Sequence, residues 1–199
     1  MELAETLRRR RMVRAYDPAA PVADGDLDAV LAAALRVPSA GFTQAVSLLT
    51  LTEPADRDLF WRTTSTGDSR WFRGMRTAPV LVLLWTDRDA YLDRYAEPDK
   101  GWRDRDPDRW SAPYWFVDAG MAALAMLLTA VDRGLGACLF GVPADRTAAV
   151  REAYGVPAGQ LSVGVVSLGH PAPGTGPQGS PTRRPRRPAE ELLHRGRWR

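Results

Sequence analysis

A long apolar run between Tyr114 and Arg133 sets the strongest limit on how this chain can fold. The run contains no proline and is followed by Gly134, so it predicts a long helix that ends at that glycine. Its length would suit a membrane span, but it carries Asp118 inside and Asp132 near its end, and no second such run is present. We therefore expect a helix at the centre of a core, or one shared by two subunits, and no membrane partner.

Shorter patterns on both sides of this run alternate between helix and strand. Asp26 is expected to cap a helix that stops before Pro38, because apolar residues follow the aspartate at helical spacing. Further helices are expected over residues 3–12 and 145–154, and strands over residues 45–52, 79–86, 136–140 and 162–168. Helices mixed with a few strands, without a repeat, predict an α+β or three-layer α/β fold.

Composition indicates a single domain over residues 1–199. Hydrophobic residues make up 45% of the chain, which is enough for one sizeable core. The first residues are rich in arginine and lack the apolar stretch of a secretion signal. Cys138 is the single cysteine and has no partner for an internal disulfide, so a cytoplasmic protein is expected. His170 and His194 lack the spacing of metal ligands, and no metal site is expected.

Arginines gather towards the two ends of the chain, although the formal net charge is only +3. One tract lies in residues 8–14 and the other in residues 183–199. Two cationic tracts indicate an anionic partner, and a solvated basic surface is the alternative interpretation. No nucleic-acid partner is expected, because neither tract lies in a recognisable nucleic-acid-binding motif.

Four segments, in order along the chain, resemble motifs of the nitroreductase family. Residues 10–16 (RRMVRAY) are similar to its N-terminal arginine motif, and residues 38–44 (PSAGFTQ) are similar to its P-S-[SA]-x-N-x-Q loop. Residues 118–141 resemble its long helix with the G-L-G turn that follows, and residues 163–171 (VGVVSLGHP) resemble its closing strand.

The resemblance implies a central, mostly antiparallel sheet flanked by helices, in an intertwined homodimer that binds FMN. The arginines would bind the phosphate through paired hydrogen bonds, and the loop at residues 38–44 would come from the partner subunit. Met12 and Phe42 stand where the family often has serine and asparagine, which removes two polar contacts. The expected cofactor-binding residues are Arg10, Arg11, Met12, Arg14, Pro38, Ser39, Ala40, Phe42, Arg73, Leu139, Phe140, Gly141, Val142, Arg184 and Arg186.

The same resemblance implies an oxidoreductase with NAD(P)H as a transient hydride donor. The flavin would be reduced by NAD(P)H and would then reduce a nitro, quinone or related organic acceptor in ping-pong fashion. Because hydride chemistry belongs to the cofactor, we assign no catalytic side chain. Two alternatives stay open: a specialised flavoprotein dehydrogenase or flavin-remodelling enzyme of a biosynthetic pathway, and a non-catalytic flavin-binding protein.

Residues 87–113 form a polar stretch with large aromatic side chains, at the place where some members of the family carry an insertion. A lid of this kind would exclude water and select the acceptor, and a surface excursion that stabilises the dimer is the alternative. The expected substrate contacts are Tyr91, Tyr95, Trp102 and Trp110. Residues 170–199 are rich in proline, glycine and arginine in their first part, which indicates an extended arm.

Overall fold

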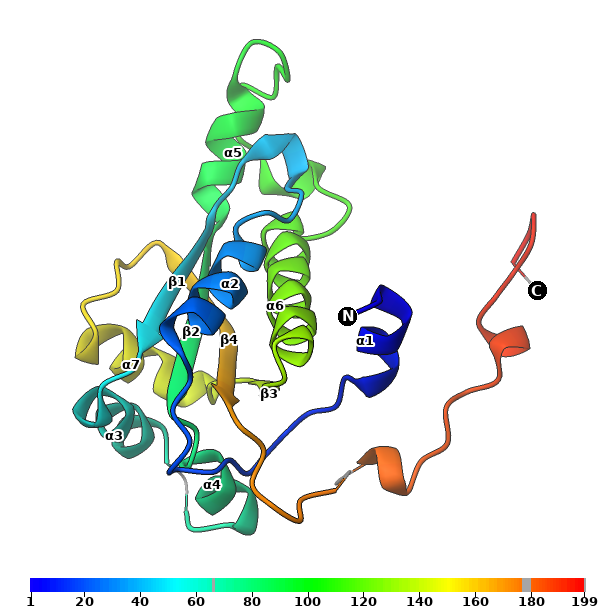
Figure 1. The fold of residues 1–199 in the computed structure, drawn as a ribbon. Helices are drawn as coiled ribbons and strands as arrows, with labels where there is room; N and C mark the ends of the chain where they lie inside the picture. The colour runs from blue at the N-terminus through cyan, green and yellow to red at the C-terminus, as the bar shows by residue number, and fades with distance from the viewer. Residues whose placement is uncertain (66, 177–179, 199) are drawn as a thin grey trace.

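A computed structural model describes residues 1–65, 67–176 and 180–198 of the chain. Its centre is a four-stranded sheet with the strand order β1-β2-β4-β3, in which all neighbouring strands are antiparallel. The strands are β1 (Val46–Leu51), β2 (Val80–Asp87), β3 (Gly136–Phe140) and β4 (Gln160–Gly169). The expected antiparallel sheet is confirmed, with β2 and β4 at its centre (Figure 1).

Helices cover both faces of this sheet. Successive residues of β2 point to opposite faces, and its even-numbered residues from 80 to 84 pack with side chains of α2 (Asp24–Ala34) and α6 (Tyr114–Asp132). Its odd-numbered residues pack with side chains of a second helix layer. That layer consists of α3 (Pro54–Thr64), α4 (Arg70–Met75) and α7 (Thr147–Ala153). The expected three-layer α/β sandwich is therefore confirmed (Figure 1).

Helix α6 agrees with the prediction of a long helix in the centre of the fold. Among the described residues it is the one helix whose length and mean hydropathy of 1.6 would suffice to cross a membrane. In the fold it packs against α2 and against strands of the sheet, and eight of its side chains are buried. Its other side exposes Phe116, Val117 and Leu124, which are 39%, 44% and 46% exposed. One face of the molecule thus carries uncovered apolar side chains.

The first two helices begin or end at other residues than expected. Helix α1 (Leu3–Arg9) stops before Met12 because the chain there runs beside β3, where Met12 forms a parallel bridge with Ala137. Helix α2 begins at Asp24 without a side-chain cap, so the prediction of Asp26 as its cap is wrong. Both aspartates lie in its first turn, where a negative charge is favoured by the helix dipole.

Three helices were not expected from the sequence. Helices α3 and α4 bury only a few residues among charged ones, so their apolar periodicity is weak. The stretch after β2 was expected to be irregular, but it begins with α5 (Arg88–Ala96). The Asp87 carboxylate caps this helix by accepting hydrogen bonds from the backbone N–H groups of Asp89 and Ala90.

After β4 the chain forms an arm. In its described residues the regular structure is limited to two short 3-10 turns, η4 (Ser180–Thr182) and η5 (Ala189–Glu191). Figure 1 shows the arm leaving the body and ending far from the sheet. Leu192, Leu193 and Trp198 of the arm are 52%, 71% and 88% exposed. These large apolar side chains have little cover within a single chain.

Candidate functional site

The arginine motif at residues 10–16 is held along the edge of β3. The Val13 N–H donates to the Ala137 carbonyl at 2.9 Å, and Gly136 lets the chain approach closely, since a Cβ there would lie 2.8 Å from the Val13 side chain. The buried Tyr16 hydroxyl donates to the Val13 carbonyl and lies 2.7 Å from the Ser167 hydroxyl. Burial raises the pKa of Tyr16, so this hydroxyl keeps its proton. The motif is therefore fixed by a parallel bridge and a buried polar contact.

Helix α4 packs directly against this motif. A Cβ on Gly74 would lie only 2.2 Å from the Arg14 carbonyl oxygen, so glycine is required for the observed approach. The Thr77 hydroxyl accepts a hydrogen bond from the Tyr16 N–H at 2.8 Å, and the Ser69 hydroxyl caps α4 by accepting from the Phe72 N–H. These contacts place the exposed arginines of α4 beside Arg14.

The first part of the arm lies on the other side of the same motif. The Asp17 N–H donates to the His170 carbonyl, and the Ala172 N–H donates to the Ala15 carbonyl. Arg11 donates from Nη1 to the Thr175 carbonyl at 2.9 Å. These contacts hold the start of the arm against the arginine motif and bring Arg183, the first arginine of the second tract, near Arg14.

An open groove of about 990 Å³ lies where α4, the arginine motif and the arm meet. The residues that line it are Arg14, Ala15, Arg70, Trp71, Arg73, Gly74, Thr175, Ser180, Thr182 and Arg183. Four of these side chains are guanidinium groups and none is a carboxylate. Arg73 also forms an exposed ion pair with Asp68, whose carboxylate lies 3.0 Å from it. The groove is suited to an anionic group such as phosphate.

A smaller pocket of about 160 Å³ shares Trp71 with this groove. Its walls are aromatic: Phe140 stacks on Trp61 with ring centres 5.8 Å apart, and it meets Trp71 edge-on at 5.5 Å. Gly141 and Val142 line the same pocket. A flat ring system suits such walls. Groove and pocket together suit a ligand with an anionic group at one end and a planar ring system at the other.

The structure brings some of the expected site residues together and separates others. Arg14 and Arg73 line the groove, and Phe140, Gly141 and Val142 line the pocket. Leu139 is half-buried in β3 and packs on the core. Arg11 and Met12 line a small cleft of about 10 Å³ beside the groove. Arg10 is half-buried outside these linings, and Arg184 and Arg186 are exposed on the arm.

Arg70 and Arg183 belong to the groove but were not expected there. Arg183 directly precedes Arg184, which was expected in the site. The sequence therefore identified the arginine tract but not this member of it. Arg70 follows Ser69, whose cap of α4 is a recognisable helix start. Ser69 was therefore the sequence signal that could have predicted α4 and, with it, the position of Arg70.

The loop with Pro38, Ser39, Ala40 and Phe42 lies at the opposite end of the sheet from the groove (Figure 1). The groove is near the start of β2, whereas the loop contacts α5, which follows the end of β2. Strand β2 contains 8 residues, and its seven steps of about 3.3 Å give a separation of about 23 Å. Loop and groove of one chain therefore cannot contact the same small ligand.

The four aromatic residues expected to contact substrate pack on one another instead of lining the groove. Tyr95 contacts Trp110 at 4.3 Å and Trp102 at 5.0 Å between ring centres. Tyr91 is buried, and its ring meets that of Trp110 at 6.0 Å. This aromatic cluster lies with α5 at the loop end of the sheet.

Known proteins share the sequence pattern and the fold. The model of the nitroreductase family matches residues 7–170. A protein of Archaeoglobus fulgidus named as an NADH dehydrogenase/NAD(P)H nitroreductase is 26% identical over 172 residues, which cover 85% of this chain and 86% of the relative. An NADH dehydrogenase of Thermus thermophilus is 28% identical over 181 residues, covering 82% of this chain and 84% of the relative.

Solved structures agree with this likeness. The structure of a nitroreductase from Desulfovibrio desulfuricans in complex with FMN has a TM-score of 0.74 at 24% identity, and the match covers 100% of this chain and 99% of that one. A structure from Parabacteroides distasonis, named as an NADH dehydrogenase/NAD(P)H nitroreductase, has a TM-score of 0.72 at 20% identity and a coverage of 98% for both chains. The family match over most of the chain, together with the shared fold, shows that this chain belongs to the nitroreductase family.

Proposed function

We propose that this protein is an FMN-dependent oxidoreductase that uses NAD(P)H as its hydride donor. The observation that carries the proposal is the groove with four arginines, which continues at Trp71 into an aromatic pocket. FMN has a phosphate at one end and a flat ring system at the other, and the two parts of the site suit them in that order. The names of the relatives, NAD(P)H nitroreductase and NADH dehydrogenase, and the FMN bound in one related structure support it.

In this proposal Arg14, Arg73 and Arg183 bind the phosphate, and the segment 140–142 with Trp71 lies beside the ring system. Bound FMN would supply the redox chemistry, taking a hydride from NAD(P)H and passing electrons to a nitro, quinone or related organic acceptor in alternate half-reactions. The side chains orient the ring and exclude water from it. No side-chain acid or base is assigned a role.

We further propose that the active form is a homodimer. The exposed apolar side of α6 supplies an interface, because uncovered Phe116, Val117 and Leu124 lie on one helix. The arm leaves the body with large apolar side chains exposed, as expected of a segment that wraps around a second copy (Figure 1). A second copy would also bring a loop of residues 38–44 to the groove of the first. Arg10, Arg184 and Arg186 would then approach the phosphate through closure of the arm and N-terminal segment.

Flavin content and reduction test this function. The purified protein should show a flavin absorption spectrum, or gain one with added FMN, at about one flavin per chain. Anaerobic titration with NADH and with NADPH should then bleach the flavin, and a panel of nitro compounds and quinones should restore its colour. A protein that gives no thermal shift with FMN would refute the proposal. Bleaching by a single metabolite, with neither nicotinamide active, would instead indicate a specialised dehydrogenase.

A further inference from the structure

The groove beside α4 contains one guanidinium group to which the proposed FMN contacts assign no role. Arg14, Arg73 and Arg183 are proposed to bind the FMN phosphate, and Arg70 is the fourth arginine that lines the groove. Arg70 lies three residues before Arg73 on α4, and residues at this spacing have Cβ atoms about 5 to 6 Å apart on the same face of a helix. The two arginines therefore place two positive charges side by side.

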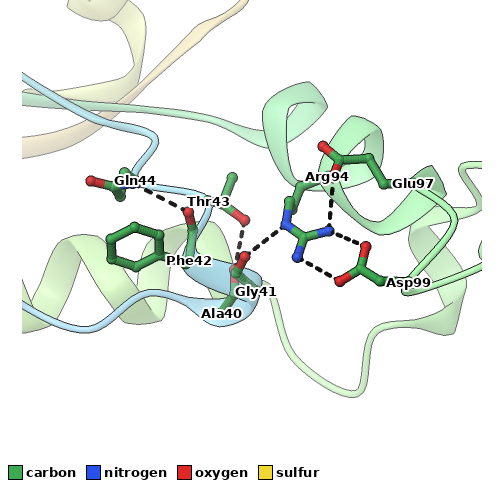
Figure 2. Close-up of polar contacts among 8 residues, drawn as sticks. All are labelled: Ala40, Gly41, Phe42, Thr43, Gln44, Arg94, Glu97 and Asp99. Carbon is green, nitrogen blue, oxygen red and sulfur yellow. Dashed lines mark hydrogen bonds and ion pairs between the residues drawn. The ribbon is translucent and has the colours of Figure 1, made fainter.

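Arg94 of α5 shows how this fold neutralises an arginine that has a structural role. Its Nε donates to the Gly41 carbonyl at 2.8 Å (Figure 2). Its other nitrogens donate two hydrogen bonds of 2.7 Å to Asp99 and one of 3.1 Å to Glu97. The hydrogen bonds from Arg94 lower the pKa of Asp99, so this partner is ionised at neutral pH. Most of the donors of Arg94 are therefore occupied, and its charge is compensated.

Arg70 has no such partners. It is exposed, and within residues 1–65, 67–176 and 180–198 its side chain forms no ion pair and no hydrogen bond. Asp68, which lies two residues before it in the chain, pairs with Arg73 instead, at 3.0 Å. None of the described residues that line the groove carries a carboxylate. The positive charge of Arg70 is therefore available to a ligand in the groove.

The phosphate of FMN alone does not compensate the charge of the groove. A phosphate monoester carries about 1.5 to 2 negative charges at neutral pH, whereas the groove presents four guanidinium groups, of which Arg73 is paired with Asp68. A positive charge therefore remains after FMN has bound. The groove meets the aromatic pocket at Trp71, the residue that follows Arg70. A donor whose nicotinamide lies on a flavin in the pocket can thus extend along the groove past Arg70.

We propose that Arg70 binds the 2′-phosphate of NADPH and makes the protein select NADPH over NADH. The two donors differ in this one phosphate monoester, which adds about 1.5 to 2 negative charges to NADPH. A guanidinium group binds such a phosphate through paired hydrogen bonds. The inference rests on the FMN-dependent function proposed above and adds the identity of the donor. Arg70 is thus a specificity-determining residue that lies beside the FMN phosphate contacts and is not one of them.

Calorimetric titration of the FMN-loaded protein tests this contact without turnover. Adenosine 2′,5′-bisphosphate should bind about ten- to a hundredfold more tightly than 5′-AMP, which lacks the 2′-phosphate, and Arg70→Ala should remove the difference. Arg76→Ala is the matched control and should keep it, because Arg76 follows α4, pairs with Asp58 and is not among the residues that line the groove. Inorganic phosphate that binds as tightly as the bisphosphate would indicate a general anion site and overturn the assignment to NADPH. A Kd for FMN that rises as much as that for the bisphosphate in Arg70→Ala would place Arg70 in the FMN site and also overturn it.

Anaerobic reduction of the bound flavin tests the consequence for the reaction. The second-order rate constant should be about ten- to a hundredfold larger with NADPH than with NADH, and Arg70→Ala should lower the NADPH value by that factor while the NADH value stays constant. Arg70→Lys, which keeps the charge without the paired hydrogen bonds, should retain part of the preference. Equal rate constants for both donors in the wild-type protein, or equal losses for both in Arg70→Ala, would overturn the inference. A flavin that neither nicotinamide reduces would refute the proposed function, whereas the bisphosphate titration would still decide about the contact with Arg70.

Discussion

Gly74→Ala should separate α4 from the arginine motif and weaken FMN binding. The added Cβ would lie 2.2 Å from the Arg14 carbonyl oxygen, whereas ordinary contacts begin near 3.4 Å. The helix or the motif must therefore move by about 1.2 Å, the difference between those two distances. Overpacking of this kind costs about 1 to 3 kcal/mol, and alanine returns at most about 1 kcal/mol through its helix propensity. We expect a net loss of stability.

Gly25→Ala is the matched control, because Gly25 also lies in a helix and a Cβ there meets nothing within 4 Å. This control should be neutral or more stable by up to about 1 kcal/mol, so the two variants should differ by about 1 to 3 kcal/mol. Urea unfolding gives both values, and flavin titration should show weaker FMN binding in Gly74→Ala alone. A Gly74→Ala protein that is as stable as the control and binds FMN like the parent would refute this account of the groove.

Three further predictions test the groove, the dimer and the half-buried Tyr154. Arg183→Ala should raise the Kd for FMN by about ten- to a hundredfold and leave riboflavin, which has no phosphate, almost unaffected. Arg186→Ala should do the same, because the arm is proposed to close on the phosphate. Leu124→Lys on the exposed side of α6 should yield monomers by light scattering, whereas Ala153→Lys on α7 should not. Burial raises the pKa of Tyr154 from 10.0 to about 12, so the unfolded chain loses this proton first, and stability should fall as the pH rises from 10 to 12. Tyr154→Phe should show a smaller decrease in urea midpoints over that range.

The sequence predicted the elements whose pattern is local and strong. Helix α6 was expected over residues 114–133 and spans Tyr114–Asp132, because an apolar run bounded by a glycine carries its own limits. The four strands were expected within a few residues for the same reason. Helix α5 was missed because its sequence, RDAYLDRYA, is mostly polar and its two buried residues, Tyr91 and Leu92, form no periodic pattern.

The sequence alone could not predict which residues meet in the site, because this depends on contacts between residues far apart in the chain. Arg14 and Arg73 were expected as ligands, but their meeting depends on Gly74, whose significance appears only when α4 lies against the Arg14 carbonyl. In the sequence, Asp118 served only as evidence against a membrane helix. Its hydrogen bond with Ala40 could not be predicted, because the two residues are 78 positions apart. The aromatic residues at 87–113 pack on one another, which no local sequence pattern predicts, and their contact with substrate stays a prediction.

The pairing of the two chain ends has a consequence for protein synthesis. Residues 15–17 bond to residues 170–172, and Arg11 bonds to Thr175, so the arginine motif is anchored by a segment that is synthesised up to 164 residues after it. Closing so long a loop is slow and depends on the sheet being formed first. A nascent chain that stops before β4 ends would lack both the anchor and the arm arginines. In the proposed function, the groove that would bind the phosphate therefore forms only after residues 170–175 have been synthesised.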